Sequence, residues 1–317
     1  MILCIGTTPA AQRTMVFRRL EREAVNRAIL TVDGAAGKAV NVGKVLHVLG
    51  EQPLVLGFLG GLRGEEVRGI LAREGVPAEF VPVQNTTRQC ITLVDETTGE
   101  VTELVEEGRP VEPEAAVQFR ALIQNRLPGA RAVVMSGTIA SGVAPGLYAE
   151  VIRLAHQEGV FSVVDAQGTA LQLALEAQPG LVKPNRKELE TTLQRPVPDD
   201  AALHAAMREL LARGSERVVV TAGQAPAWAA DGRHWWRITA PIVPALNPIG
   251  SGDAFTAAVV ARLVAGDDLG EACRWGAAAG AANALTHLSG EVRRVDVERL
   301  LPLATAERTA PVVKGFC

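Results

Sequence analysis

The chain has few lysines and no surplus of either charge. Its 317 residues include five lysines against 27 arginines, and its 32 basic and 35 acidic residues give a formal net charge of −3. This balance excludes the extended basic surface with which proteins hold nucleic acids or anionic membranes. Any anionic ligand must therefore be bound by a few local cations, which makes the position of each lysine informative.

Cysteine motifs and long apolar runs are also missing. The four cysteines are scattered, with no C-x-x-C pair and no histidine at ligand spacing, so neither a disulfide framework nor a zinc site is expected. No basic leader precedes the first apolar residues, and Arg262 interrupts the apolar stretch 254–265 well short of a membrane span. We expect a cytoplasmic protein that does not enter a membrane.

Short β-branched runs alternate with amphipathic stretches along most of the chain. Strands are predicted at 2–6, 53–58, 132–136, 160–165 and 217–221, and helices at about 38–49, 63–74, 112–126, 145–158, 199–213, 251–265 and 269–287. This is the βαβ pattern of a mostly parallel sheet that helices cover on both faces. The predicted fold class is therefore α/β.

Two segments break this pattern. Residues 11–34 and 86–107 read as strands with no helix between them, and the polar run from Asp95 to Gly99 predicts a hairpin turn. We interpret these strands as a small lid sheet inserted into a single domain of residues 1–317, because no long Pro/Gly linker divides the chain. About the last ten residues are expected to form a loose tail.

The strongest candidate site is the run Asn-Pro-Ile-Gly-Ser-Gly-Asp at 247–253, which leads into an apolar helix. Gly250 and Gly252 allow close approach of the backbone, and successive N–H groups at a helix N-terminus form an anion cradle. Asp253 is placed to accept a proton from a hydroxyl while the amides stabilise a phosphoryl group in transfer. The alternative is an ordinary helix start in which Asp253 only complements the helix dipole.

A second glycine loop, Gly-Ala-Ala-Gly-Lys-Ala-Val-Asn at 34–41, carries one of the five lysines into a helix. In the functional interpretation Gly37 and the helix N-terminus approach an anion, Lys38 supplies a point charge, and Asn41 reaches sugar hydroxyls. The loop is not a Walker motif, because Ala rather than Ser or Thr follows Lys38. The alternative is a tight turn with a solvated lysine.

The run Lys-Pro-Asn-Arg-Lys-Glu at 183–188 follows another short strand-like segment. Asn185 and Glu188 have the spacing of a capping box, which satisfies backbone N–H groups without any chemistry. Alternatively, these two side chains organise water around Mg²⁺ beside nucleotide phosphates, since Mg²⁺ keeps much of its hydration shell. Spacing alone favours the cap.

Five further residues are less informative by themselves. Thr221 and Gly223 end a buried strand at a glycine turn and Asp165 ends another, which is where parallel sheets bind ligands and also where ordinary turns lie. Arg88 begins a predicted lid strand, either as an exposed strand residue or as a bidentate clamp on a substrate phosphate. Ser136 lacks the context of a nucleophile elbow, so a hydrolase triad finds no support.

Taken in order, these segments resemble the ribokinase-like (PfkB) carbohydrate kinases over residues 2 to about 290. The matching motifs are Gly-Lys-x-x-Asn at 37–41, Thr-Arg at 87–88, Ser-Gly at 136–137, Lys-Pro-Asn-x-x-Glu at 183–188 and Gly-Ser-Gly-Asp at 250–253. Each motif is weak alone, but their common order is specific. Ala-Ala-Gly-Lys-x-x-Asn-Val and Asn-Pro-x-Gly-Ser-Gly-Asp are most similar to the branch of 1-phosphofructokinases and tagatose-6-phosphate kinases.

The resemblance implies a three-layer α/β/α sandwich with a β lid, which transfers the γ-phosphoryl group of ATP, with Mg²⁺, to a hydroxyl of a phosphorylated ketohexose. It implies Asp253 as the base and Gly250, Ser251 and Gly252 as the anion hole. The implied substrate residues are Gln12, Gly37, Lys38, Asn41, Arg88 and Ser136, and the implied nucleotide residues are Lys183, Asn185, Glu188, Thr221 and Gly223. Lid strands of this family often pair between subunits, so a homodimer is expected.

Within these sets the resemblance gives Lys38 and Arg88 the phosphate that the substrate already carries. It places Asn185 and Glu188 near Mg²⁺, with contact through water. The kinase interpretation also sets a geometric requirement, because Asp253 must lie near Lys38 and away from bulk solvent.

The chain departs from this branch at several positions. Where the branch has Asn-Pro-x-x-Asp near the N-terminus, this chain has Thr-Pro-Ala-Ala-Gln at 8–12, and Gln12 lacks the charge of a carboxylate. Ala39 replaces a glycine, and Pro226 replaces the second glycine of the nucleotide loop. Two alternatives follow: a kinase for an unphosphorylated sugar, a sugar acid or a nucleoside, and a sugar-phosphate or nucleotide sensor without turnover.

Overall fold

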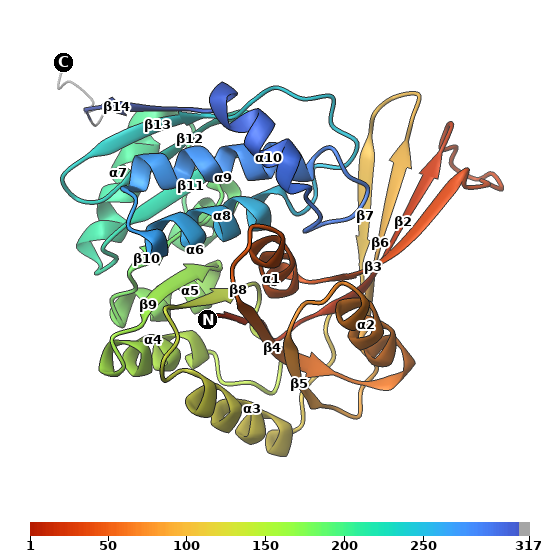
Figure 1. The fold of residues 1–317 in the computed structure, drawn as a ribbon, viewed down its shortest axis with the longest axis horizontal. Helices are drawn as coiled ribbons and strands as arrows, with labels where there is room; N and C mark the ends of the chain where they lie inside the picture. The colour runs from red at the N-terminus through yellow and green to blue at the C-terminus, as the bar shows by residue number, and fades with distance from the viewer. Residues whose placement is uncertain (311–317) are drawn as a thin grey trace.

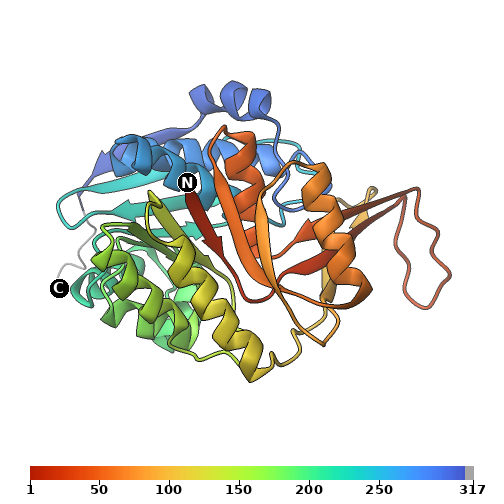
Figure 2. The ribbon, with the colours of Figure 1, turned by 60° about the horizontal axis from the view of Figure 1, so that its bottom comes forward.

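The computed structural model describes residues 1–310, which form two β-sheets and the helices packed on them (Figures 1 and 2). The strands of the large sheet are β1 (Ile2–Ile5), β4 (Pro53–Leu59), β5 (Ala78–Pro82), β8 (Ala132–Ser136), β9 (Phe161–Asp165), β10 (Leu181–Val182), β11 (Val218–Ala222), β12 (Ala225–Ala230), β13 (Trp235–Thr239) and β14 (Thr305–Thr309). Their order is β14-β13-β12-β11-β10-β9-β8-β1-β4-β5. All pairs from β5 to β11 are parallel and those from β11 to β14 are antiparallel, which confirms the predicted mostly parallel α/β sheet.

Alternate residues of the central strands supply two apolar cores, one on each face of the large sheet. In β1, Ile2 and Cys4 belong to one core, and Leu3 and Ile5 belong to the other. Successive side chains of a strand point to opposite faces, so a strand with helices on both sides must be apolar throughout. This is why the central strands read as continuous apolar runs in the sequence.

Helices cover both faces, giving three layers. One core packs against α1 (Lys38–Val48), α2 (Gly61–Arg73), α8 (Ser251–Ala265), α9 (Leu269–Asn283) and α10 (Arg294–Leu300), which the short turn η1 (Leu301–Leu303) follows. The other packs against α3 (Pro113–Arg126), α4 (Leu147–Gln157), α5 (Gly168–Glu176), α6 (Arg186–Leu193) and α7 (Asp200–Ala212). Figure 1 shows α8, α9 and α10 on one side of the large sheet and α3 and α4 on the other.

A second sheet of four strands projects from this body (Figure 1). Its strands are β2 (Ala10–Phe17), β3 (Leu30–Ala36), β6 (Arg88–Asp95) and β7 (Val101–Val105), in the order β3-β2-β6-β7. The predicted hairpin turn is confirmed, since Gly99 N–H donates to the carbonyl of Asp95 at 2.8 Å. We call these four strands the small sheet. Its central pair, β2 and β6, is parallel, while both outer pairs are antiparallel.

Several elements differ from the predictions at the C-terminal side of the chain. The helix predicted at 269–287 ends at Asn283, and the strands β12, β13 and β14 were not predicted. Arg308 and Thr309 belong to β14, which pairs with β13, whereas the rest of the expected loose tail, residues 311–317, lies outside the described residues. The polar sequence of β14 does not predict a strand by itself, because this strand depends on its hydrogen bonds to β13. No helix within residues 1–310 has the length and apolar character to span a membrane.

Candidate functional site

The carboxyl ends of three parallel strands and the first turns of three helices meet at one edge of the large sheet. Ser136 and Asp165 are the last residues of β8 and β9, and Lys183 directly follows β10. Parallel strands run the same way, so their carboxyl ends share an edge, and ligands bind at this edge in such folds. The helices α1, α6 and α8 each begin there, as the contacts of their first residues show.

Asp165 lies at the centre of a buried ion cluster. Its carboxylate is fully buried, with Oδ1 2.9 Å from Nζ of Lys38 and Oδ2 3.0 Å from Nζ of Lys183. Thr256 donates its hydroxyl to the same Oδ2 at 2.8 Å. Burial would raise the pKa of Asp165, but the charges of Lys183 and Lys38 outweigh it and hold the pKa well below its usual range. Asp165 therefore stays ionised and fixes both lysines.

Lys38 is bound by two carboxylates. Besides Asp165, its Nζ donates to Oε1 of Glu188 at 2.8 Å. Burial would lower the pKa of Lys38, but the charges of Asp165 and Glu188 raise it above its ordinary value. The alternative of a freely solvated lysine is therefore wrong, because this ammonium group is held in place at the start of α1.

The capping box at the start of α6 is confirmed. Asn185 Oδ1 accepts from the backbone N–H of Glu188 at 2.9 Å, and Glu188 Oε2 accepts from the backbone N–H of Asn185 at 2.8 Å. The other oxygen of Glu188 remains for Lys38. The cap thus orients a carboxylate toward the ion cluster, so its structural role does not conflict with a functional one. Thr221 pairs with Asn185 as an isolated β-bridge and lies beside the same turn.

Asp253 lies in the first turn of α8 and is 6% exposed. Its Oδ2 accepts a hydrogen bond of 2.6 Å from Nδ2 of Asn41. Burial raises the pKa of Asp253 to about 7, against the smaller effects of the Lys38 charge and of the hydrogen bond from Asn41. The side chain is therefore sheltered from bulk solvent and within the electrostatic reach of Lys38, as the kinase interpretation requires.

Two amides of the predicted anion cradle are unpaired. Among residues 1–310 the N–H groups of Gly250 and Gly252 have no hydrogen-bond acceptor, whereas the N–H of Ser251 donates to the carbonyl of Pro248 at 3.2 Å. A Cβ on Gly252 would lie 3.8 Å from Nζ of Lys183. The free amides and a buried ammonium group thus lie at the same helix terminus, an arrangement that favours an anion.

The side-chain oxygen of Gln12 accepts two hydrogen bonds from one neighbouring residue. Its Oε1 accepts from the backbone N–H of Ser289 at 3.2 Å and from the Ser289 hydroxyl at 2.8 Å. The same hydroxyl lies 3.4 Å from Oδ1 of Asn41. Gln12 therefore connects the small sheet to the residues that surround Asp253, and its carbonyl oxygen is already used.

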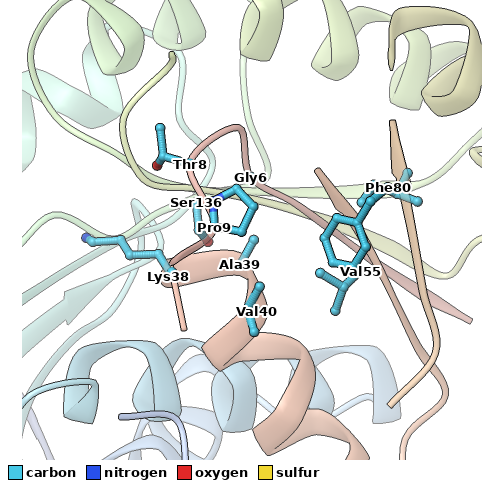
Figure 3. Close-up of a pocket in the computed structure, with 11 residues that line it drawn as sticks. Gly6, Thr8, Pro9, Lys38, Ala39, Val40, Val55, Phe80 and Ser136 are labelled. Carbon is cyan, nitrogen blue, oxygen red and sulfur yellow. The ribbon is translucent and has the colours of Figure 1, made fainter. Parts of the chain in front are cut away.

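Lys38 and Arg88 line different cavities. A small cavity of about 10 Å³ lies between Lys38, Ser136 and Phe80, and Figure 3 shows the Lys38 side chain extending away from Phe80. The Ser136 hydroxyl is buried, and it has no hydrogen-bond partner in the described part of the chain. Arg88 lines a second cavity of about 40 Å³, and Thr8 belongs to the walls of both.

Arg88 is positioned by backbone carbonyls. Its Nε and Nη2 donate to the carbonyl of Thr8 at 3.2 and 3.0 Å, and its Nη1 donates to the carbonyl of Glu106 at 3.4 Å.

Two glycines of the predicted site lie in different surroundings. Gly223 follows β11 in a turn with a φ of 63°, where a Cβ would meet nothing within 4 Å. Gly223 thus borders open space, and Gly37 lies at the start of α1 next to Lys38.

A family model described as pfkB family carbohydrate kinase matches residues 1–293. The chain belongs to this family. As a pfkB carbohydrate kinase it is a phosphotransferase that acts on a sugar hydroxyl. The resemblance that the ordered motifs indicate is confirmed, and so is the ribokinase-like fold, because solved structures of the family superpose on most of the chain.

Three relatives are similar to this pfkB kinase in sequence or in structure. A tagatose-6-phosphate kinase of Staphylococcus epidermidis is 28% identical over 295 residues, which cover 92% of this chain and 94% of the relative. The structure of phosphofructokinase-2 from Escherichia coli in complex with substrates and products has a TM-score of 0.89 at 27% identity, covering 95% of this chain and 98% of that one. A "possible 1-phosphofructokinase" from Thermotoga maritima has a TM-score of 0.89 at 24% identity, with 98% and 99% covered, and supports the fold alone.

Sequence reasoning missed residues that act through distant contacts. The sequence left two interpretations of Asp165 equally open, although the structure shows that it pairs with both Lys38 and Lys183. Its position at the end of a buried strand was a usable signal. Thr256 and Ser289 carried no signal, because their partners lie 91 and 277 residues away in the sequence.

Proposed function

We propose that this carbohydrate kinase transfers the γ-phosphoryl group of ATP to a hydroxyl of a phosphorylated ketohexose, of the fructose 1-phosphate or tagatose 6-phosphate type. The observation that carries the proposal is the buried carboxylate of Asp253, held by Asn41 beside the unpaired amides of Gly250 and Gly252. The substrate class is supported by the similarity to a tagatose-6-phosphate kinase.

In this proposal Asp253 is the base. With a pKa near 7, part of the population carries the free carboxylate at neutral pH, and that carboxylate takes the proton of the acceptor hydroxyl as its oxygen bonds to phosphorus. The bond between the γ-phosphorus and ADP breaks in the same transfer. Phosphoryl transfer depends mainly on positioning and charge neutralisation, which the amides of Gly250 and Gly252 and the ammonium group of Lys183 supply.

The nucleotide would bind along the carboxyl ends of β10 and β11. Thr221 and Gly223 border the open turn at the end of β11, and Lys183 follows β10 with its Nζ 3.8 Å from the position of a Cβ on Gly252. Asn185 and Glu188 stand at the start of the adjacent helix α6. This arrangement supports the assignment of these residues to the ATP side of the site.

Mg²⁺ fits this site only with most of its water retained. Within residues 1–310 no group of three His, Cys, Asp or Glu side chains is placed to hold a metal ion. Both oxygens of Glu188 already accept hydrogen bonds, and Oδ1 of Asn185 accepts one as well. These residues would therefore hold Mg²⁺ through water, and the ion when bound would neutralise charge on the ATP phosphates.

The small sheet would close over the sugar as a lid and join two subunits. Ile29, Leu30, Leu104 and Val105 are exposed apolar residues at its two outer strands, so a partner would bury them. Sedimentation of the wild type and of Leu104→Glu tests the homodimer. A monomeric wild type contradicts it, whereas a dimer that Leu104→Glu dissociates supports it.

Steady-state turnover of three acceptors tests the function. Fructose 1-phosphate, tagatose 6-phosphate and unphosphorylated fructose are compared by kcat/KM with ATP and Mg²⁺, and we expect a phosphorylated sugar to be preferred. Preference for unphosphorylated fructose would instead favour the second acceptor class of unphosphorylated sugars, sugar acids and nucleosides, which Gln12 in place of a carboxylate suggests. Ligand binding without turnover of any acceptor would indicate a sensor.

A further inference from the structure

The cavity of about 40 Å³ at the base of the small sheet is lined by two arginines and no acid. Its walls come from the loop after β1, from the start of β6 and from the segment after β7. Arg88 and Arg109 contribute guanidinium groups, and Asn85, Thr8 and Thr86 contribute polar side chains. The composition of this cavity suits an anionic group, although the whole chain has a net charge of −3.

Neither arginine of this cavity forms a close ion pair with a carboxylate among residues 1–310, although the charge of Arg88 acts on Glu103 and that of Arg109 helps to lower the pKa of Glu106. Arg88 donates only to backbone carbonyls, and Arg109 forms no ion pair within residues 1–310. Among the neighbouring acids, Glu106 is already engaged through its Oε2, which accepts from Arg63 at 2.7 Å and from the backbone N–H of Gln89 at 3.0 Å.

Two positively charged side chains line this cavity and no acid does, so the cavity favours an anion. Guanidinium groups bind phosphate through paired, charge-assisted hydrogen bonds, which makes them well suited to this anion. Lys38 does not line this cavity, and its ammonium group is already bound to Asp165 and Glu188.

We propose that Arg109 is a specificity-determining residue that, together with Arg88, binds the phosphate the acceptor sugar already carries. This inference rests on the proposed function and refines it, since it assigns the second cation of the phosphate site to Arg109 instead of Lys38. Thr8 and Pro9 line both this cavity and the one beside Lys38. A sugar anchored by its phosphate at the two arginines would extend past these two residues toward Lys38.

The test compares Arg109→Gln with a matched control, Arg153→Gln. Arg153 is exposed on α4 and lines neither cavity. We expect Arg109→Gln to raise KM for fructose 1-phosphate and tagatose 6-phosphate about 10-fold or more, the usual cost of a lost charge-assisted hydrogen bond. The KM for ATP and the kcat/KM for unphosphorylated fructose should stay within about 2-fold. Arg109→Lys should recover part of the loss, since the charge remains and the paired geometry does not.

Calorimetric titration of fructose 1-phosphate and of inorganic phosphate without ATP gives a readout that needs no turnover. Weaker binding of both to Arg109→Gln, at an unchanged melting temperature, supports the inference. If the wild type phosphorylates sugar phosphates and Arg109→Gln binds them equally well, the inference is wrong and the proposed function stands. If the wild type binds neither fructose 1-phosphate nor inorganic phosphate, both the proposed substrate class and this inference are wrong.

Discussion

The side-chain amide of Asn41 donates a hydrogen bond of 2.6 Å to Oδ2 of Asp253 and so connects the first turn of α1 to the first turn of α8. These residues stand 212 positions apart in the sequence. A hydrogen bond from an amide favours the ionised form of a carboxyl group, whereas burial favours the neutral form. The pair therefore sets how much of Asp253 is available as a base near neutral pH.

Asp253→Asn should abolish most of the activity while sparing binding. An amide cannot accept the hydroxyl proton, and a positioned base contributes about 10²–10⁴-fold to the rate. We expect kcat to fall by that factor with the KM for ATP within a few-fold of wild type, measured in a coupled ADP-release assay. A kcat within a few-fold of wild type would exclude Asp253 as the base.

The pH dependence of the wild type should follow the titration of Asp253. Burial raises its pKa to about 7, and the base acts as the carboxylate, so kcat/KM should rise with pH and reach half its maximum near pH 7. Asn41→Ala removes a hydrogen bond that favours the carboxylate of Asp253. The rise of kcat/KM should therefore move to higher pH in this variant. The control Asn125→Ala, exposed on α3, should leave the profile unchanged. A profile that is flat from pH 5 to 9 in the wild type would argue against this base.

Gly250→Ala should damage both stability and turnover. Gly250 has a φ of 86°, and a Cβ there would lie 2.7 Å from Cβ of Ser289. The left-handed conformation costs a residue with a Cβ roughly 1–2 kcal/mol, and overpacking adds about 1–3 kcal/mol.

Gly266→Ala is the matched control at the other end of α8. Its φ is 99°, but a Cβ there would meet nothing within 4 Å, so only the conformational cost of roughly 1–2 kcal/mol applies. Urea denaturation measures both variants. Equal losses of unfolding free energy would show that the contact with Ser289 does not matter.

Asp165→Asn should destabilise the fold strongly, because it leaves Lys38 and Lys183 without their shared counter-ion. Removing one partner of a buried ion pair costs about 3–5 kcal/mol. The control Asp33→Asn breaks the exposed pair with Arg13 and should cost at most about 1 kcal/mol.

The stabilisation from Asp165 should also depend on pH. The pKa of Asp165 is lower in the folded chain than its ordinary value of 3.8, so the carboxylate stabilises the fold above that pH. As the pH falls below about 3.8 toward the folded pKa, this contribution is lost. The difference in unfolding free energy between wild type and Asp165→Asn should therefore shrink in acid, and a constant difference from pH 7 to pH 2 would contradict the assignment.

Local patterns predicted the elements that frame the site. The helices expected at 38–49, 145–158 and 251–265 were found at Lys38–Val48, Leu147–Gln157 and Ser251–Ala265. Apolar periodicity and end signals act within a few residues of the chain, so the sequence carries them directly. The antiparallel strands β12 to β14 were not predicted, because these strands form by pairing with one another and with β11 rather than from a local sequence pattern.

The amino-acid sequence by itself determined the alternation of strands and helices, the capping box at Asn185 and the order of motifs that indicates a carbohydrate kinase. Only the tertiary structure decided the partners of the charged groups. Lys38 meets Asp165 across 127 residues and Glu188 across 150, while Arg88 and Arg109 line a separate cavity. These contacts depend on strand register and on how helices pack over the sheet, and spacing along the chain does not specify either.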